Sequence, residues 1–147
     1  MNEPKKLIDT PSQTAGPFLH IGCAPRITGI NIFKSELGLT PFQDISDNEA
    51  INIKGKIYDG NGEPIIDAMI ETWQCDANGK YSSNQGFARI VTDFKTGEYQ
   101  LKTIRPGNKI NTDESLSASY ITFWIVARGM NRPLITRMYF LEKDLKK

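Results

Sequence analysis

From residue 50 onward the chain is a succession of short apolar segments, most of them ended by a turn that contains glycine or proline. The segments are rich in β-branched and aromatic residues, and the first of them alternates isoleucine with polar residues, as a strand with one buried face does. Such strands are expected at 51–57, 65–74, 87–93, 98–103, 120–127 and 135–141. Short strands joined by tight turns predict an all-β sandwich that requires no helix.

The turns between these segments give further detail. Residues 59–62 and 76–79 are strong turn signals, because glycine accepts a positive φ and asparagine tolerates one. Asp59, Asp76 and Asp93 lie at strand ends and are expected to form turns rather than to act as catalytic acids. Residues 95–97 are expected to close a hairpin between the third and fourth segments, and the strongly apolar 120–127 is expected to be central, with 135–141 as its neighbour.

The first 49 residues have a different character. Five prolines and four glycines interrupt them, so we expect an irregular N-terminal arm over 1–49 that packs on the sandwich domain, 50–147, or on a partner subunit. A chain of 147 residues with this composition is expected to form one compact unit. Its net charge of +1 gives no electrostatic argument for nucleic acid or an acidic membrane as a partner.

Other classes are also disfavoured by the sequence. The apolar stretches are too short for a transmembrane helix or a signal peptide, so a cytoplasmic location is expected. The two cysteines, Cys23 and Cys75, are then expected to be reduced thiols. One histidine, His20, and the absence of a C-x-x-C motif make a zinc site unexpected.

Seven motifs carry a more specific signal, namely residues 10–22, 55–62, 71–81, 87–89, 103–107, 125–129 and 136–140. In this order they resemble the intradiol ring-cleavage dioxygenases over about residues 10–140. The resemblance implies an all-β sandwich with an extended N-terminal arm, here shortened at the C-terminus. It also implies catechol-cleaving chemistry on a non-haem Fe³⁺ held by two tyrosines and two histidines.

The resemblance places those ligands at positions that this chain has largely changed. The two histidines of the family's H-x-H motif correspond to Tyr120 and Thr122, and one tyrosine is kept as Tyr81. The second tyrosine would follow Gly107, where the chain continues Asn-Lys-Ile. We therefore expect a vestigial metal site, no bound metal and no catalytic residue in this chain.

Protocatechuate-cleaving members of the family combine an iron-free alpha chain with a beta chain that holds Fe(III). Residues 12–17 and 127–129 are similar to the alpha chain, which lines the substrate cavity across the subunit interface. The resemblance thus implies a beta-chain partner, and substrate contacts from Thr14, Pro17, Phe18 and Arg128. The reaction it implies opens protocatechuate with O₂ to 3-carboxy-cis,cis-muconate. Phe18 stands where the family usually has tyrosine, so that hydroxyl is absent.

These roles agree with the chemistry of the residues. Arginine suits a planar carboxylate, Pro17 and Phe18 would form an apolar wall, and Thr14 can donate a hydrogen bond. Simpler interpretations remain for single residues. Arg128 would pair with an interface carboxylate, and Tyr81 and His20 would be packing residues. Arg89 would hold a buried acid or a turn carbonyl.

Two other functions stay open for the whole chain. One is a non-enzymatic, transthyretin-like β-sandwich binding module, because the motifs around residues 55–65 and 92–101 also occur in such modules. The other is a self-sufficient intradiol catechol dioxygenase, against which the missing H-x-H argues.

Overall fold

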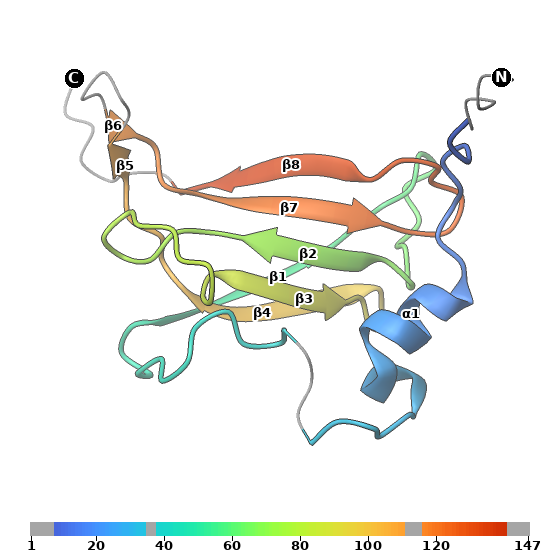
Figure 1. The fold of residues 1–147 in the computed structure, drawn as a ribbon, viewed down its shortest axis with the longest axis horizontal. Helices are drawn as coiled ribbons and strands as arrows, with labels where there is room; N and C mark the ends of the chain where they lie inside the picture. The colour runs from blue at the N-terminus through green and yellow to red at the C-terminus, as the bar shows by residue number, and fades with distance from the viewer. Residues whose placement is uncertain (1–7, 35–37, 111–115, 141–147) are drawn as a thin grey trace, which may run out of the picture.

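The computed structural model describes residues 8–34, 38–110 and 116–140 (Figure 1). Two short helical segments precede the strands: α1 (Pro17–Cys23) and the 3₁₀ helix η1 (Pro25–Thr28). The strands are β1 (Ala50–Lys56), β2 (Met69–Trp73), β3 (Phe87–Val91), β4 (Glu98–Ile104), β5 (Lys109–Ile110), β6 (Leu116–Ser117), β7 (Tyr120–Val126) and β8 (Leu134–Tyr139). Within these ranges no helix has the length and apolar character needed to cross a membrane.

Six of these strands form two layers, and β5 and β6 pair with each other as a separate two-stranded sheet. The larger is a four-stranded antiparallel sheet in the order β3-β2-β7-β8, and the smaller is the antiparallel pair β1-β4. Figure 1 shows β1 and β4 behind the larger sheet. The central position of β7 and the pairing of β8 with it confirm what the apolar pattern predicts, and the two layers confirm the all-β sandwich.

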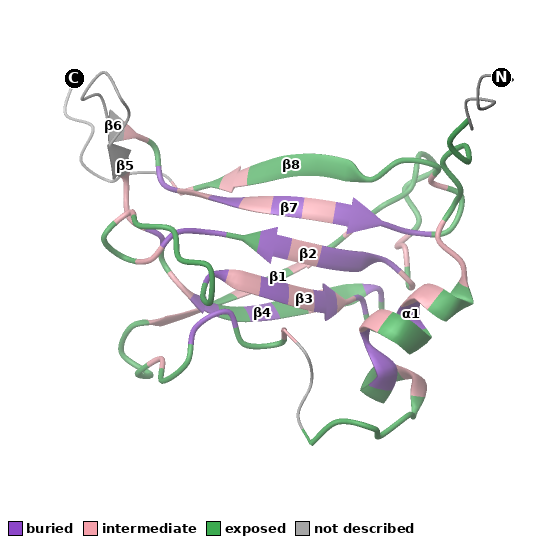
Figure 2. Cartoon of the chain, in the orientation of Figure 1, coloured by how far each residue is buried: buried purple, intermediate pink, exposed green. Residues whose placement is uncertain are grey.

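The hydrophobic core fills the space between the layers. Ile70 of β2 lies opposite Ile90 of β3 on one side and Ile125 of β7 on the other, and all three are buried. Leu101 of β4 closes the core from the smaller sheet. In Figure 2 the buried colour gathers on β2, β3 and β7, whereas β8 is almost entirely exposed.

The predicted hairpin between β3 and β4 is wrong. The two strands follow one another through a tight turn, but β3 pairs with β2 and β4 pairs with β1. The Asp93 carboxylate accepts the N–H groups of Lys95 and Thr96 at 2.9 and 2.7 Å, which closes the turn locally. Beyond the turn the chain changes layer, because Ile90 and Leu101 contribute to the core from opposite sheets.

The predicted irregular character of the arm is wrong for residues 17–28, which form α1 and η1. Pro17 occupies the first turn of α1, where its fixed φ favours a helix and its missing N–H costs nothing. A helix of 7 residues is not stable alone. The arm packs on its own domain instead: the carbonyls of Gly38 and Pro41 accept the N–H groups of Arg89 and Gly86, both at 2.7 Å.

Candidate functional site

The candidate site lies where the arm meets the end of β7. The turn after β7 carries Arg128 and Gly129, and the backbone N–H of Gly129 donates to Oγ1 of Thr14 at 2.7 Å. Gly129 has a φ of 85°, which favours glycine at this turn. The contact brings the arm against the sandwich and leaves a cavity of about 310 Å³. Residues that line it include Pro17, His20, Ile66, Asp67, Phe94 and Arg128.

Arg128 is held by a carboxylate of its own chain. Its Nε donates to Oδ2 of Asp67, whose side chain is only 16% exposed, whereas the Arg128 side chain is 68% exposed. The paired part of the β2–β7 ladder ends at Met69 and Val126, and Asp67 and Arg128 each lie two residues beyond this last pair. The expected carboxylate partner of Arg128 therefore exists, but within the chain. Sequence reasoning did not single out Asp67; the signal that could have found it is the pairing of β2 with β7, because Asp67 lies two residues before β2 and Arg128 two residues after β7.

The structure gathers three of the four predicted substrate-binding residues around this cavity. Pro17 and Arg128 line it, and Thr14 is bonded to the backbone next to Arg128. Phe18 does not line it: the side chain is 82% exposed on α1. The apolar wall expected from Pro17 and Phe18 is therefore formed by Pro17, Ile66 and Phe94.

His20 is a packing residue, as one interpretation of the sequence proposed. It is 7% exposed, and its ring meets Phe94 edge-on with the ring centroids 5.8 Å apart. Its Nε2 is buried, and within the described part of the chain it has no hydrogen-bond partner. The chain's sole histidine is thus an uncompensated polar group beside the cavity.

The vestigial ligand positions lie together on the outer face of the large sheet. Tyr120 and Thr122 of β7 share this face because they are two residues apart. Arg137 of β8 lies opposite Thr122, and its guanidinium carbon is 4.4 Å from the centre of the Tyr120 ring. Tyr81 stacks on Trp73 of β2, which also lies opposite Thr122, with ring centroids 6.1 Å apart.

This cluster does not fit a ferric ion. Iron(III) is bound by phenolates together with further anionic or imidazole donors, whereas this cluster offers two phenols, the neutral Thr122 hydroxyl and the cationic Arg137. A guanidinium cation already lies over the second phenol. In residues 8–34, 38–110 and 116–140 no group of three or more His, Cys, Asp or Glu side chains could hold a metal ion. Tyr81 itself is partly exposed, stacks on Trp73 and shares a hydrogen bond with Tyr120.

Arg89 holds an acid and a backbone carbonyl, although the acid is only half-buried and the carbonyl belongs to α1 rather than to a turn. Its Nε and one terminal nitrogen donate to Oε1 of Glu71 at 2.8 and 2.6 Å, and its other terminal nitrogen donates to the carbonyl of Cys23 at 3.3 Å. It thereby ties α1 to the large sheet.

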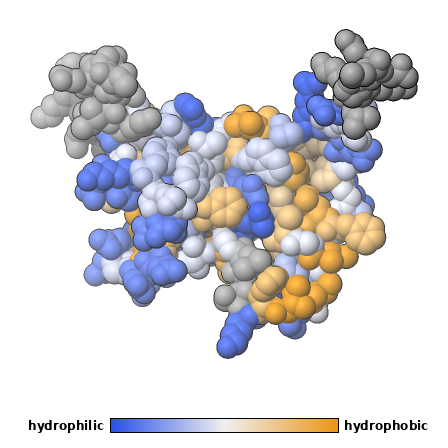
Figure 3. Space-filling view, in the orientation of Figure 1, coloured by the Kyte–Doolittle hydropathy of each residue, from blue (hydrophilic) through white to orange (hydrophobic). Residues whose placement is uncertain are grey.

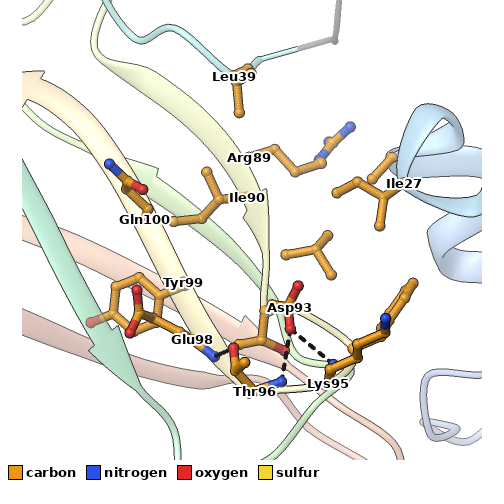
Figure 4. Close-up of a pocket in the computed structure, with 14 residues that line it drawn as sticks. Ile27, Leu39, Arg89, Ile90, Asp93, Lys95, Thr96, Glu98, Tyr99 and Gln100 are labelled. Carbon is orange, nitrogen blue, oxygen red and sulfur yellow. Dashed lines mark hydrogen bonds between the residues drawn. The ribbon is translucent and has the colours of Figure 1, made fainter.

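A larger cavity of about 700 Å³ lies beside Arg89, between η1 and the β3–β4 turn (Figure 4). Two of its charged groups are engaged, since Arg89 binds Glu71 and Asp93 accepts the turn's N–H groups, and none of the four predicted substrate-binding residues lines it. The cavity at Arg128 is therefore the better candidate.

The remaining single-residue predictions are confirmed. The carboxylates of Asp59, Asp76 and Asp93 each accept backbone N–H groups two to four residues further along the chain, as turn formers do. Cys23 and Cys75 are not joined by a disulfide, and Sγ of Cys75 donates to the carbonyl of Gly107 at 3.4 Å.

Comparisons with known proteins show the family of the chain. A family model described as "Dioxygenase" matches residues 34–146. The protocatechuate 3,4-dioxygenase alpha chain of Pseudomonas putida is 38% identical over 91% of this chain and 70% of its own length. The Burkholderia cepacia alpha chain is 32% identical over 91% and 71%. The Burkholderia cepacia beta chain is 28% identical over 63% of this chain and 45% of its own.

Solved structures support the fold. The crystal structure of catechol 1,2-dioxygenase from Pseudomonas arvilla C-1 has a TM-score of 0.60 and 21% identity, over 69% of this chain and 38% of that one. The present chain thus spans well under half of that enzyme. The relatives do not favour a transthyretin-like module, and the cluster at Tyr81 does not favour a self-sufficient dioxygenase. The chain belongs to the intradiol dioxygenase family and is a homologue of the protocatechuate 3,4-dioxygenase alpha chains.

Proposed function

We propose that this chain is the iron-free alpha subunit of a cytoplasmic protocatechuate 3,4-dioxygenase and completes the substrate cavity of a beta subunit that holds Fe(III). The assembly would cleave protocatechuate with O₂ to 3-carboxy-cis,cis-muconate in the breakdown of aromatic compounds. Support comes from the alpha-chain relatives and from a donor set that does not fit iron. The beta subunit's ferric iron would supply the oxidative chemistry.

The contribution of this chain would be to bind and orient the substrate. Arg128 presents an exposed guanidinium, which suits the fixed planar carboxylate of protocatechuate. Thr14 accepts a hydrogen bond from Gly129 through Oγ1, so its own hydroxyl proton stays available for donation to a ligand. Pro17 adds an apolar surface for an aromatic ring.

The surface of the arm supports a protein partner. Figure 3 shows hydrophobic side chains gathered over the region of α1 and η1. Exposed apolar residues of this part of the chain are Phe18, Ile21, Ile27, Ile30, Ile32 and Phe33. A contiguous apolar surface of this kind is typical of a protein interface. Phe18 is next to Pro17, so a partner that covers this patch would lie beside the candidate cavity.

The observation that carries the proposed role in substrate binding is the hydrogen bond between Gly129 and Thr14, because it joins the arm and the turn with Arg128 in one site. The test is Arg128→Ala in a complex reconstituted with an iron-bearing beta chain. KM for protocatechuate should rise about 10- to 100-fold, the range for a hydrogen-bonded charged group. KM for catechol, which has no carboxylate, should change little.

Arg132→Ala is the matched control, because it removes an exposed arginine four residues away. Equal losses on both substrates in Arg128→Ala would contradict the carboxylate role. A protocatechuate KM that rises as much in Arg132→Ala would show a general charge effect instead.

A further inference from the structure

We infer that Asp67 is a positioning residue for substrate binding: it holds Arg128 by Nε and so presents the outer edge of the guanidinium to a substrate carboxylate. This inference rests on the proposed function, because it deepens the role given there to Arg128. Three observations carry it: the position of the two residues just beyond the last β2–β7 pair, the unequal exposure of the two side chains, and the atom through which they meet.

The ends of two paired strands bring the carboxylate to Arg128. Met69 of β2 and Val126 of β7 form the last pair of the antiparallel ladder, Asp67 and Arg128 each lie two residues beyond it, and there the Asp67 carboxylate accepts from Nε of Arg128. The backbone behind Asp67 is held firmly, because the N–H of Ala68 donates to Oγ1 of Thr92 at 3.0 Å in the buried core. Asp67 is thus anchored at the end of the sheet.

The side chains of Asp67 and Arg128 differ strongly in their exposure to solvent. Asp67 is 16% exposed and Arg128 is 68% exposed, so a mostly buried group holds a group that reaches solvent. An exposed arginine otherwise samples many rotamers, and a ligand must restrict them on binding at a cost in free energy. A partner that fixes the guanidinium beforehand reduces this cost.

Asp67 contacts Arg128 through Nε, which leaves the two terminal nitrogens of the guanidinium for a substrate carboxylate. Guanidinium has five N–H donors, and a planar carboxylate binds a pair of them side by side. Asp67 takes the donor on Nε, whereas within the described residues the terminal nitrogens of Arg128 bond to no other side chain. The edge formed by the two terminal nitrogens therefore remains available, and a substrate carboxylate need not displace Asp67.

If Asp67 instead sequestered Arg128 from the substrate, removing Asp67 would change substrate affinity in the opposite direction. If Asp67 competed with the substrate for the cation, its removal would strengthen substrate binding. If Asp67 positions the cation, its removal weakens binding of the carboxylated substrate alone. The sign of the change in KM separates the two roles.

The experiment compares Asp67→Ala and Asp67→Asn in the reconstituted complex, with protocatechuate and catechol as substrates. Asp67→Ala should raise KM for protocatechuate about three- to tenfold, the range of one hydrogen bond, and leave kcat unchanged. Asp67→Asn should restore most of the affinity, because its amide oxygen still accepts from Nε. KM for catechol should stay the same in both variants.

Asp47→Ala is the matched control: its carboxylate pairs with exposed Lys102 at 2.9 Å on the smaller sheet. A protocatechuate KM that is unchanged or lower in Asp67→Ala overturns the inference. So does an equal rise for catechol. Arg128→Ala in the same assay separates the two proposals. If Arg128→Ala leaves KM for protocatechuate unchanged, the carboxylate-binding role of Arg128 itself is wrong. If Arg128→Ala raises this KM but Asp67→Ala does not, only the positioning role of Asp67 is wrong.

Discussion

Gly129 and Thr14 are separated by 115 positions in the chain, yet the backbone N–H of Gly129 donates to the Thr14 hydroxyl oxygen at 2.7 Å. The bond joins the N-terminal arm to the turn that carries Arg128. Because Pro17 follows three residues after Thr14, the same contact brings an apolar surface beside the guanidinium. The candidate cavity is thus made jointly by the arm and the sandwich.

Replacing Thr14 with valine should loosen this junction. Valine keeps the shape of threonine but cannot accept the hydrogen bond, so the attachment of the arm should lose about 1 kcal/mol. Amide hydrogen exchange of Gly129 should become faster in Thr14→Val and stay as in the parent in Thr14→Ser, which keeps the hydroxyl. Unchanged protection of Gly129 in the valine variant would contradict the role of this bond.

Phe18 should matter to assembly rather than to folding. Its side chain is 82% exposed, so Phe18→Ser should change the free energy of unfolding of this chain by less than about 0.5 kcal/mol. Loss of a large aromatic contact should weaken the complex with a beta chain by at least about tenfold. Ile8→Ser, at an exposed residue outside α1 and η1, is the control. If the parent and Phe18→Ser bind the beta chain with equal affinity, Phe18 is not part of the interface.

The ion pair of Arg89 should stabilise the fold more than an exposed pair does. Arg89→Met keeps the apolar stem but leaves the half-buried Glu71 and the Cys23 carbonyl without their donor. Urea unfolding should show a loss of about 2 kcal/mol. Lys102→Met, which breaks the exposed pair with Asp47, should cost no more than about 0.5 kcal/mol. Similar losses in the two variants would show that Arg89 is not a structural tie.

Stability at alkaline pH should depend on Tyr81. Burial, followed by the hydrogen bond with Tyr120, raises the pKa of Tyr81 above the usual 10.0. The folded chain then keeps this proton more strongly than the unfolded chain. The resulting stability is complete below pH 10 and is lost as the pH rises from there toward the folded pKa.

Denaturation midpoints measured at several pH values test this effect. Tyr81→Phe should show a shallower decline above pH 10 than the parent does. Part of the decline should remain, because burial also raises the pKa of Tyr99. Tyr58→Phe, at an exposed position, is the control. An equally steep decline in Tyr81→Phe would assign the effect to other groups.

Much of the fold was predictable because local patterns determine it. The alternation around Ile53 and the apolar run of β7 mark strands directly, and Asp59, Asp76 and Asp93 form the turns that they predict. The partner of each strand was harder to predict. A tight turn after β3 suggests a hairpin, but the choice of sheet depends on which core side chains face each other across the layers.

The site was predictable only in part. Thr14, Pro17 and Arg128 follow from motifs, and the structure brings them together. Asp67 was missed because it meets Arg128 just beyond the paired ends of β2 and β7, and no local pattern shows that these two strands pair. Helix α1 was missed because its 7 residues lie among prolines and glycines and are held by tertiary contacts. The exposure of Phe18 depends on the same helix.

The most direct test is to purify this chain alone and together with an iron-bearing beta chain, and to measure iron content and the visible spectrum of each. The account predicts a colourless, iron-free chain alone, and a stable complex that contains iron and shows a tyrosinate-to-Fe³⁺ absorption band. A chain that binds iron and shows this band on its own would contradict the assignment of Tyr81, Tyr120 and Thr122 to a lost metal site. Failure to form any complex would contradict the proposed role as an alpha subunit.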